Sequence, residues 1–243
     1  MGELVSYRLR DGVATVTMDD GKVNALSPAM LGQVGAALDR AAADGAIVVL
    51  AGRPGVFSGG FDLAIVRGGG TRAVGMFRSG FELAARILSF PRPVVIACTG
   101  HAVAMGAFLV LSGDYRIGAA GPYRLTANEV AIGLTLPRAA AEICRQRLAP
   151  AHFSRATVLA EVYSPDAAVA AGFLDAIAEP AALATAAHDA AQRMRALDPA
   201  AHAATKLGVR EATLAALHAA IDRDFAAAVA SPPAAGAAAP AAR

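Results

Sequence analysis

The sequence predicts an α/β fold, and two patterns in its 243 residues carry that prediction. Runs made only of apolar residues, at 46–50 and 93–98, have the length of strands buried on both faces of a parallel sheet and are too short for helices. Elsewhere apolar residues recur with helical spacing, as they do from Phe77 to Leu88. Strands that alternate with amphipathic helices favour a parallel sheet covered by helices.

The beginning of the chain fits this pattern. β-Branched residues alternate at 13–18, which predicts a strand, and the turn residues at 19–21 end it. Ser27 is a suitable N-cap, and Pro28 stands at the first helical position, where its missing N–H costs nothing. A helix with an apolar stripe from Met30 to Leu38 is therefore expected.

Two glycine-containing segments that follow strands are the candidate functional loops. The first, 52–63, carries the adjacent Gly59 and Gly60, which permit close backbone approach or positive φ. The second, 100–114, begins with a turn of small residues and continues into an apolar helix, whose first N–H groups can hold an anion or a developing oxyanion. Glu129 follows among apolar residues and is the natural base.

The glycine-rich stretch 68–71 is a third loop and is expected to be flexible. It lacks the Lys-Ser/Thr ending of a P-loop, which argues against a phosphate cradle of that kind. Beyond Pro137 the sequence predicts helices at 138–148, 151–159 and 165–171, a short strand ending near Ile177, and two alanine-rich helices at about 180–197 and 199–229. The expected organisation is a core at 1–179, a helical region at 180–230 and a disordered tail at 231–243.

Composition excludes several classes of protein. Apolar residues make up 56% of the chain, but no run approaches the roughly 18 residues that a membrane helix needs. The charged amino terminus does not resemble a signal peptide, so a cytoplasmic protein is expected. A net charge of +2 with scattered basic residues argues against nucleic-acid binding. Cys98 and Cys144 are expected to be structural thiols, and the spacing of the histidines predicts no metal site.

Three motifs together resemble the crotonase, or enoyl-CoA hydratase/isomerase, superfamily over about residues 4 to 228. They are Asn24-Ala25-Leu26-Ser27, Phe57-Ser58-Gly59-Gly60-Phe61-Asp62-Leu63, and Gly100 to Asp114 with the continuation Tyr115-Arg116-Ile117. The resemblance implies a spiral core of repeated ββα turns, a C-terminal helical trimerisation region, and a homotrimer or homohexamer. It also implies an acyl-CoA thioester substrate and no separate cofactor, since coenzyme A is part of the substrate.

The resemblance also assigns site residues. Two backbone N–H groups, those of Phe61 and Met105, would hold the thioester oxygen as an oxyanion hole. Many relatives have glycine where Met105 stands, and the alternative is that both segments are only tight βα turns. The positions implied to bind substrate are Val23, Ala25, Gly59, Gly60, Leu63, Gly106 and Phe108.

The carboxylates distinguish the branches of the family. The hydratases of the family that this chain resembles use two glutamates to position a water molecule and deliver a proton. In this chain Phe108 stands where the first glutamate would be, and Glu129 stands where the second would be. A phenyl ring cannot activate water, but one carboxylate can carry a proton from C2 to C4. The Asn128-Glu129 step is similar to that of Δ3,Δ2-enoyl-CoA isomerases. The structural alternative is that Glu129 only caps a turn or pairs with a nearby arginine, Arg124 or Arg138.

Two other functions remain open at this point: an enoyl-CoA hydratase that uses Glu129 alone, and a catalytically weak acyl-CoA-binding protein. Met105 and Phe108 keep the second of these open. Three C-terminal cations could meet the CoA phosphates or could be solvated surface charges: Lys206, Arg210 and Arg223. Structural, capping or packing roles are expected for Asp62, His101, Asp114 and Glu142.

Overall fold

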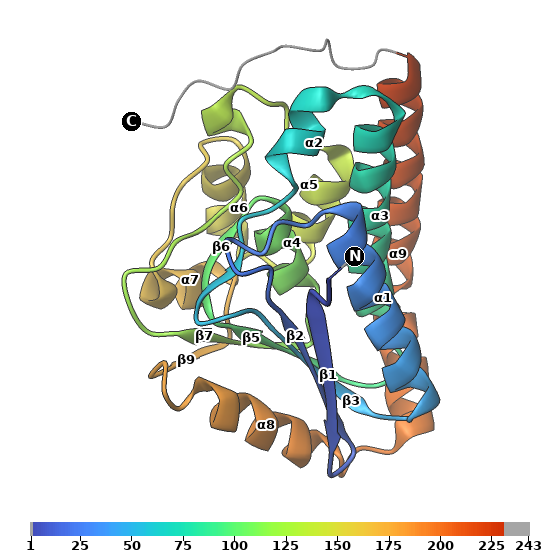
Figure 1. The fold of residues 1–243 in the computed structure, drawn as a ribbon, viewed down its shortest axis with the longest axis vertical. Coiled ribbons are helices and arrows are strands. Elements are labelled where there is room, and N and C mark those ends of the chain that lie inside the picture. The colour runs from blue at the N-terminus through green and yellow to red at the C-terminus, as the bar shows by residue number, and fades with distance from the viewer. Residues whose placement is uncertain (1, 231–243) are drawn as a thin grey trace.

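The main sheet has six strands in the order β1-β2-β3-β5-β7-β9 (Figure 1). The computed structural model describes residues 2–230, with side chains as far as residue 226, so the predicted tail at 231–243 lies outside the described residues. β1 and β2 pair antiparallel, and every other neighbouring pair in this sheet is parallel. The strands are β1 (Val5–Arg10), β2 (Val13–Met18), β3 (Ile47–Ala51), β5 (Val94–Cys98), β7 (Tyr115–Ala119) and β9 (Ala176–Ala178). The predicted α/β fold is confirmed.

Alternate residues of the central strands face opposite layers, as the pleat requires. Ile47 and Val49 of β3 join the core on one face, whereas Val48 and Leu50 join the core on the other. All four side chains are buried. This burial on both faces explains why β3 is continuously apolar in the sequence.

α8 (Leu183–Met194) covers one face of the sheet and lies below it in Figure 1. Its small buried residues, including Ala187 and Ala191, pack against Val13, Ile47 and the outward residues of β5. The sequence predicts a separate helical region at 180–230. In the structure, the buried residues of α8 belong to the same hydrophobic core as one face of the main sheet. Alanine suits this position because a helix without bulky side chains can lie close to a sheet.

Helices α1 (Pro28–Ala43), α3 (Gly70–Ser89) and α4 (Met105–Ser112) cover the other face. α1 begins as predicted, with the Ser27 hydroxyl accepting a hydrogen bond from the Met30 N–H at 3.2 Å. The remaining helices are α2 (Leu63–Gly68), the short 3₁₀ helix η1 (Val130–Ile132), α5 (Arg138–Arg145), α6 (Pro150–Thr157) and α7 (Pro165–Ala171).

The glycine-rich stretch 68–71 differs from its expected form as a flexible loop. Gly68 ends α2 and Gly70 begins α3, so only Gly69 lies between two helices. Gly69 adopts a φ of 61°, and its N–H donates to carbonyls at the end of α2. The glycines therefore make a sharp helix junction.

A second sheet, which the sequence did not predict, has the parallel order β4-β6-β8. Its strands are β4 (Gly55–Ser58), β6 (Gly100–Val103) and β8 (Leu125–Thr126). Because the strands are parallel, their carboxyl ends meet at one edge. The three segments that leave this edge carry Phe61, Met105 and Glu129, so the small sheet brings the predicted site residues together.

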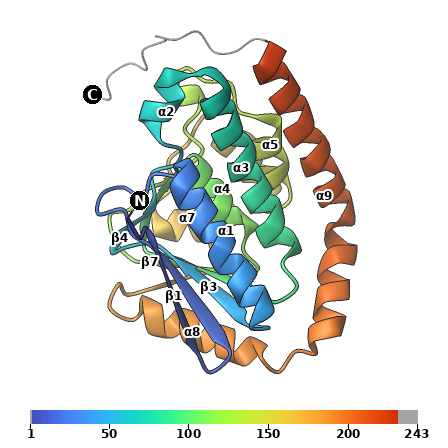
Figure 2. The same cartoon turned by 45° about the vertical axis from the view of Figure 1, so that its right-hand side comes forward.

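The last helix, α9 (Pro199–Ala230), runs along the side of the molecule against α3 and α5 (Figure 1 and Figure 2). A buried ion cluster holds it there. The Asp114 carboxylate accepts from the Lys206 ammonium at 2.7 Å, lies 2.9 Å from the Arg210 guanidinium and also accepts from the Val94 N–H at 2.7 Å. Within residues 2–230, no helix is long and apolar enough to cross a membrane.

This cluster corrects one expectation. Only 4% of the Lys206 side chain and 13% of the Arg210 side chain are exposed. Neither side chain is therefore placed to contact the phosphates of a CoA molecule bound to the same subunit. Burial lowers the pKa of Lys206, although the charge of Asp114 opposes that effect. Arg223 is exposed and donates to the Ala219 carbonyl of its own helix. The expected structural role of Asp114 agrees with its contacts.

Replacing Asp114 with alanine should therefore destabilise the protein strongly, by about 3–5 kcal/mol, because two buried cations lose their counter-charge. The control is Asp39→Ala, which removes an exposed carboxylate that lies 2.6 Å from Arg86 and should cost less than about 1 kcal/mol. Urea unfolding of both variants measures the difference. Equal effects would show that the buried cluster does not hold α9.

Candidate active site

The two predicted oxyanion donors stand at the ends of adjacent strands of the small sheet. Phe61 follows β4 after Gly59 and Gly60, and Met105 follows β6 as the first residue of α4. Within residues 2–230, neither the Phe61 nor the Met105 N–H donates a hydrogen bond to the protein. Both N–H groups therefore lack an acceptor among these residues.

Glycine allows the two donor loops to approach each other. A Cβ at Gly60, whose φ is 91°, would lie 2.9 Å from the Val103 carbonyl oxygen and 3.5 Å from the Met105 nitrogen. A Cβ at Gly106 would lie 2.9 Å from the Ser58 Cβ and would collide with the Ser58 carbonyl. Each loop thus contacts the other through a residue that has no side chain.

The residue before the second donor is strained. Ala104 has a φ of 51° and a ψ of −125°, a conformation that costs an L-residue on the order of 1–3 kcal/mol. Its N–H donates to the Thr126 carbonyl at 2.9 Å, and its own carbonyl accepts from the Phe108 N–H at 3.1 Å. These bonds to β8 and α4 hold the turn that aims the Met105 N–H away from the helix.

Phenylalanine side chains fill the space around the donors. The Phe61 ring centroid lies 4.9 Å from that of Phe77 and 6.1 Å from that of Phe81, and Phe81 stacks on Phe108 at 6.2 Å. Phe108 is 1% exposed and Met105 is not exposed at all. A thioester can therefore reach the Met105 N–H only if neighbouring side chains shift.

Glu129 is a buried carboxylate that pairs with no cation in the described part of the chain. Its exposed fraction is 7%, and its Oε2 atom has no hydrogen-bond partner among the described residues. Burial raises the pKa of Glu129 to about 7, and a backbone hydrogen bond opposes this only in part. Arg138 pairs with Asp224 at 3.0 Å rather than with Glu129, and the backbone N–H of Arg124 donates to His101. The structural alternative of an ion pair with either arginine has no geometric support.

Other polar atoms that lack partners belong to residues close to Glu129 in the sequence. Thr126 Oγ1 and Asn128 Oδ1 lack hydrogen-bond partners in the described part of the chain. Burial raises the pKa of the Cys144 thiol, and the nearby charge of Glu129 raises it further. Cys98 and Cys144 are both free and buried. Glu129 is therefore a buried carboxyl group whose neighbours in the sequence include polar atoms that lack partners among the described residues.

The residues implied to bind substrate fall into two groups. Gly60, Gly106 and Phe108 are buried beside the donors, while Val23, Gly59 and Leu63 are exposed and Ala25 is partly exposed. The exposed group can form the rim of a site of which the buried group is the floor.

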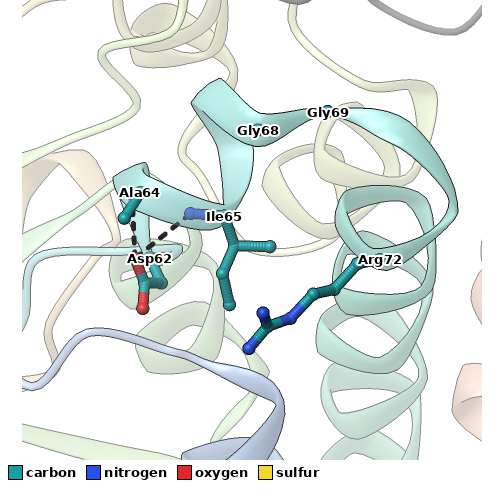
Figure 3. A pocket seen from close by; sticks show the side chains of 6 residues that line it. All are labelled: Asp62, Ala64, Ile65, Gly68, Gly69 and Arg72. Atoms are coloured by element: carbon teal, nitrogen blue, oxygen red, sulfur yellow. Dashed lines mark hydrogen bonds between the residues drawn. The ribbon is translucent and has the colours of Figure 1, made fainter.

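A cavity of about 500 Å³ begins directly beyond Phe61, between α2 and the start of α3 (Figure 3). Asp62 caps α2 as expected, accepting from the Ala64 N–H at 2.9 Å. Arg72 reaches from α3 toward Ile65 across this space. The described residues contain no group of three or more side chains suited to a metal ion.

Sequence reasoning missed a set of residues that hold the first donor loop. The sequence pattern indicates a turn at Asp20 and predicts no role for the side chains of Asn24 and Ser58. In the structure they form one hydrogen-bonded network next to Gly60. The available signal was an aspartate four residues before an asparagine, since both side chains favour tight turns.

Comparisons with known proteins identify the family and the fold. The sequence profile of the family described as enoyl-CoA hydratase/isomerase matches residues 8–231. An enoyl-CoA isomerase structure from Mycobacterium tuberculosis has a TM-score of 0.89 and 50% identity, covering 93% of this chain and 99% of that one. Human mitochondrial Δ3,Δ2-enoyl-CoA isomerase has a TM-score of 0.89 and 27% identity, covering 94% and 91%.

A protein of Rhodobacter capsulatus described as a probable enoyl-CoA hydratase is 36% identical over 117 residues. That match covers 47% of this chain and 46% of the relative. In this comparison the chain therefore spans less than half the length of the protein that it matches.

The raised pKa of Glu129 predicts a pH-dependent stability. Because the folded protein holds this proton up to about pH 7, while 4.5 is the ordinary value, the free energy of unfolding should fall as pH rises between these values. A shift of this size corresponds to about 3 kcal/mol. Glu129→Gln removes the effect, so the variant should gain that much relative to the wild type between pH 5 and 8.

Urea unfolding at several pH values measures this gain. The control is Glu179→Gln, which replaces an exposed carboxylate and should show no comparable trend. A stability difference between Glu129→Gln and the wild type that does not change with pH would contradict the prediction.

Proposed function

Because the chain belongs to the enoyl-CoA hydratase/isomerase family, we propose that it shifts the double bond of 3-enoyl-CoA to give 2-enoyl-CoA. Glu129 is the catalytic base and acid, and the Phe61 and Met105 N–H groups form the oxyanion hole. The observation that carries this proposal is that Glu129 is the single buried carboxylate among the described residues, and the resemblance to the family places Phe108 where hydratases have their second glutamate.

The reaction needs one proton carrier. The ionised Glu129 carboxylate removes a proton from C2, and the electron pair moves into a dienolate whose negative charge lies on the thioester oxygen. The two backbone donors stabilise this oxygen, at about 2.7–4 kcal/mol for each well-placed donor. Glu129 then returns the proton to C4, so no water is consumed and the carboxylate is regenerated.

The environment of Glu129 supports this role. A pKa of about 7 lets the group accept and return a proton near neutral pH. Its Oε2 has no hydrogen-bond partner among the residues that the structure describes, so it is free to face the substrate carbon. The aromatic side chains around Phe108 exclude water, which protects the dienolate from protonation by solvent. The human isomerase among the similar proteins supports the same assignment, whereas the M. tuberculosis protein is described both as an enoyl-CoA isomerase and as a probable enoyl-CoA hydratase.

The proposed substrate is an extended thioester. Its acyl chain lies against the phenylalanines around the donors, and the cavity between α2 and α3 accommodates part of the molecule (Figure 3). The exposed Val23, Gly59 and Leu63 lie at the rim, where the CoA portion reaches solvent.

An assay with separate 3-enoyl-CoA and 2-enoyl-CoA tests the function. The wild type should move the double bond of the first and add little water to the second, and the rate at low substrate should rise with pH until about 7, as Glu129 ionises. Glu129→Gln should lose about 10²–10⁴-fold in turnover and keep its affinity for acyl-CoA, because the oxyanion donors are backbone groups.

Different outcomes identify the alternatives. Hydration as fast as isomerisation would favour the hydratase, an activity named for the R. capsulatus relative. Tight acyl-CoA binding without either reaction would favour a binding protein. Loss of affinity together with turnover in Glu129→Gln would show that Glu129 is structural.

The protein also belongs, in this proposal, to a homotrimer or homohexamer. Three apolar side chains close together after α6 are exposed: Val158 by 60%, Leu159 by 72% and Val162 by 54%. Apolar side chains grouped in this way are typical of surfaces that another chain covers.

Sedimentation at micromolar concentration should therefore show a trimer or hexamer, and Leu159→Glu should shift the population toward smaller species. The control Leu9→Glu introduces the same charge at a residue of β1 that is 45% exposed and should leave the assembly intact. A wild-type monomer at this concentration would contradict the proposal.

A further inference from the structure

We propose that Asp20, Asn24 and Ser58 are positioning residues that fix the first oxyanion donor, the Phe61 N–H. The inference rests on the proposed use of that N–H. Asn24 and Ser58 have no exposure, so they cannot touch a substrate in this arrangement and act only through the backbone.

Three hydrogen bonds join the loop at 19–26 to three successive residues before Phe61. The Ser58 hydroxyl donates to the Asn24 carbonyl at 2.8 Å, and the Gly59 N–H donates to the Val23 carbonyl at 2.8 Å. The Gly60 carbonyl accepts from the Leu26 N–H, also at 2.8 Å. The peptide groups that lead to Phe61 are thus fixed from one side.

Asn24 is the centre of this network. Its φ is 51°, a left-handed conformation that asparagine tolerates better than most residues. Its amide nitrogen donates to the Met18 carbonyl at 3.0 Å and to the Phe57 carbonyl at 3.1 Å, while its Oδ1 accepts from the Asp20 N–H at 3.0 Å. One side chain therefore ties the end of β2 to the end of β4.

Asp20 fixes the loop that presents Asn24. Its Oδ1 accepts from the N–H groups of Lys22 at 2.7 Å and Asn24 at 2.8 Å, and its Oδ2 accepts from the Ala25 N–H at 2.8 Å. Burial tends to raise the pKa of Asp20, but these three donors outweigh it and hold the pKa below its ordinary value. The carboxylate is thus kept ionised as a turn-forming acceptor.

Ser58 connects Asn24 to Gly60, the residue before the donor Phe61. Its hydroxyl accepts from the Gly60 N–H at 3.1 Å while it donates to the Asn24 carbonyl. Gly60 in turn abuts the Val103 carbonyl and the Met105 nitrogen. Any displacement of Gly60 therefore changes the direction of the Phe61 N–H and its spacing from Met105. A misplacement of about 1 Å can cost on the order of a hundredfold in rate.

Ser58→Ala is the first test, with Ser112→Ala as the matched control. Ser112 is an equally buried serine, but its hydroxyl donates only to the Phe108 carbonyl within α4. Ser58→Ala should lower kcat for isomerisation by about tenfold to a hundredfold and change KM by less than about threefold, since a donor acting on developing charge is displaced. Ser112→Ala should keep kcat near the wild-type value.

A spectroscopic measurement separates positioning from general destabilisation. A 3-ketoacyl-CoA loses its C2 proton to give an enolate with its own ultraviolet absorbance, and the oxyanion hole stabilises that enolate. The enolate signal of bound 3-ketoacyl-CoA should fall in Ser58→Ala and persist in Ser112→Ala at equal saturation. Asp20→Asn alters the partly exposed loop rather than the core and should reduce kcat and the enolate signal in the same way, which provides a second test if Ser58→Ala does not fold.

Each outcome separates the two proposals. If Ser58→Ala and Asp20→Asn retain the enolate signal and kcat, the positioning role is wrong while the isomerase remains. If the wild type forms the enolate but does not isomerise, and the variants lose the signal, the positioning role holds and the proposed reaction is wrong. A wild type that forms no enolate overturns both.

Discussion

The close approach of the two donor loops is the constraint on which the site depends. Gly60 lies against the Val103 carbonyl and the Met105 nitrogen, and Gly106 lies against Ser58. A methyl group at either glycine would push the loops apart by several tenths of an ångström or more. Ala104, immediately before Met105, adopts a positive φ, which is a strained backbone conformation for an alanine. Strain at this residue is offset by its hydrogen bonds to β8 and α4.

The small parallel sheet makes this approach possible. β4, β6 and β8 each end at the same edge, and each is followed within a few residues by one component of the site. The main sheet and α8 support this arrangement indirectly, because they hold β5, the strand that precedes β6 in the chain. The Asp114 cluster binds α9 to the segment that follows α4, so the helix that carries Met105 is held at both ends.

Burial gives Glu129 its chemical character. A carboxylate in water would be fully ionised at neutral pH and a weak base, whereas burial favours the protonated form and brings the pKa to about 7. The absence of an ion pair among the described residues matters equally, because a nearby cation would lower the pKa and would occupy the Oε2 atom, which has no partner there. Phe108 contributes by taking the place of a charged group with a ring that packs on Phe81.

The sequence by itself determined the features that depend on local pattern. Apolar runs gave β3 and β5, Ser27 and Pro28 gave the start of α1, and the motifs around Gly60, Met105 and Glu129 identified the family and its candidate site residues. These signals are short in range, since propensity, capping and periodicity involve residues within a few turns or strand positions.

Only the tertiary structure decided how those residues act together. β4, β6 and β8 are too short to be recognised from propensity, and their pairing joins residues more than 20 positions apart. The role of Asn24 depends on its hydrogen bond to Phe57, 33 residues later. Lys206 likewise depends on Asp114, 92 residues earlier, which accepts its hydrogen bond. Such effects arise from packing between segments, which no local pattern encodes.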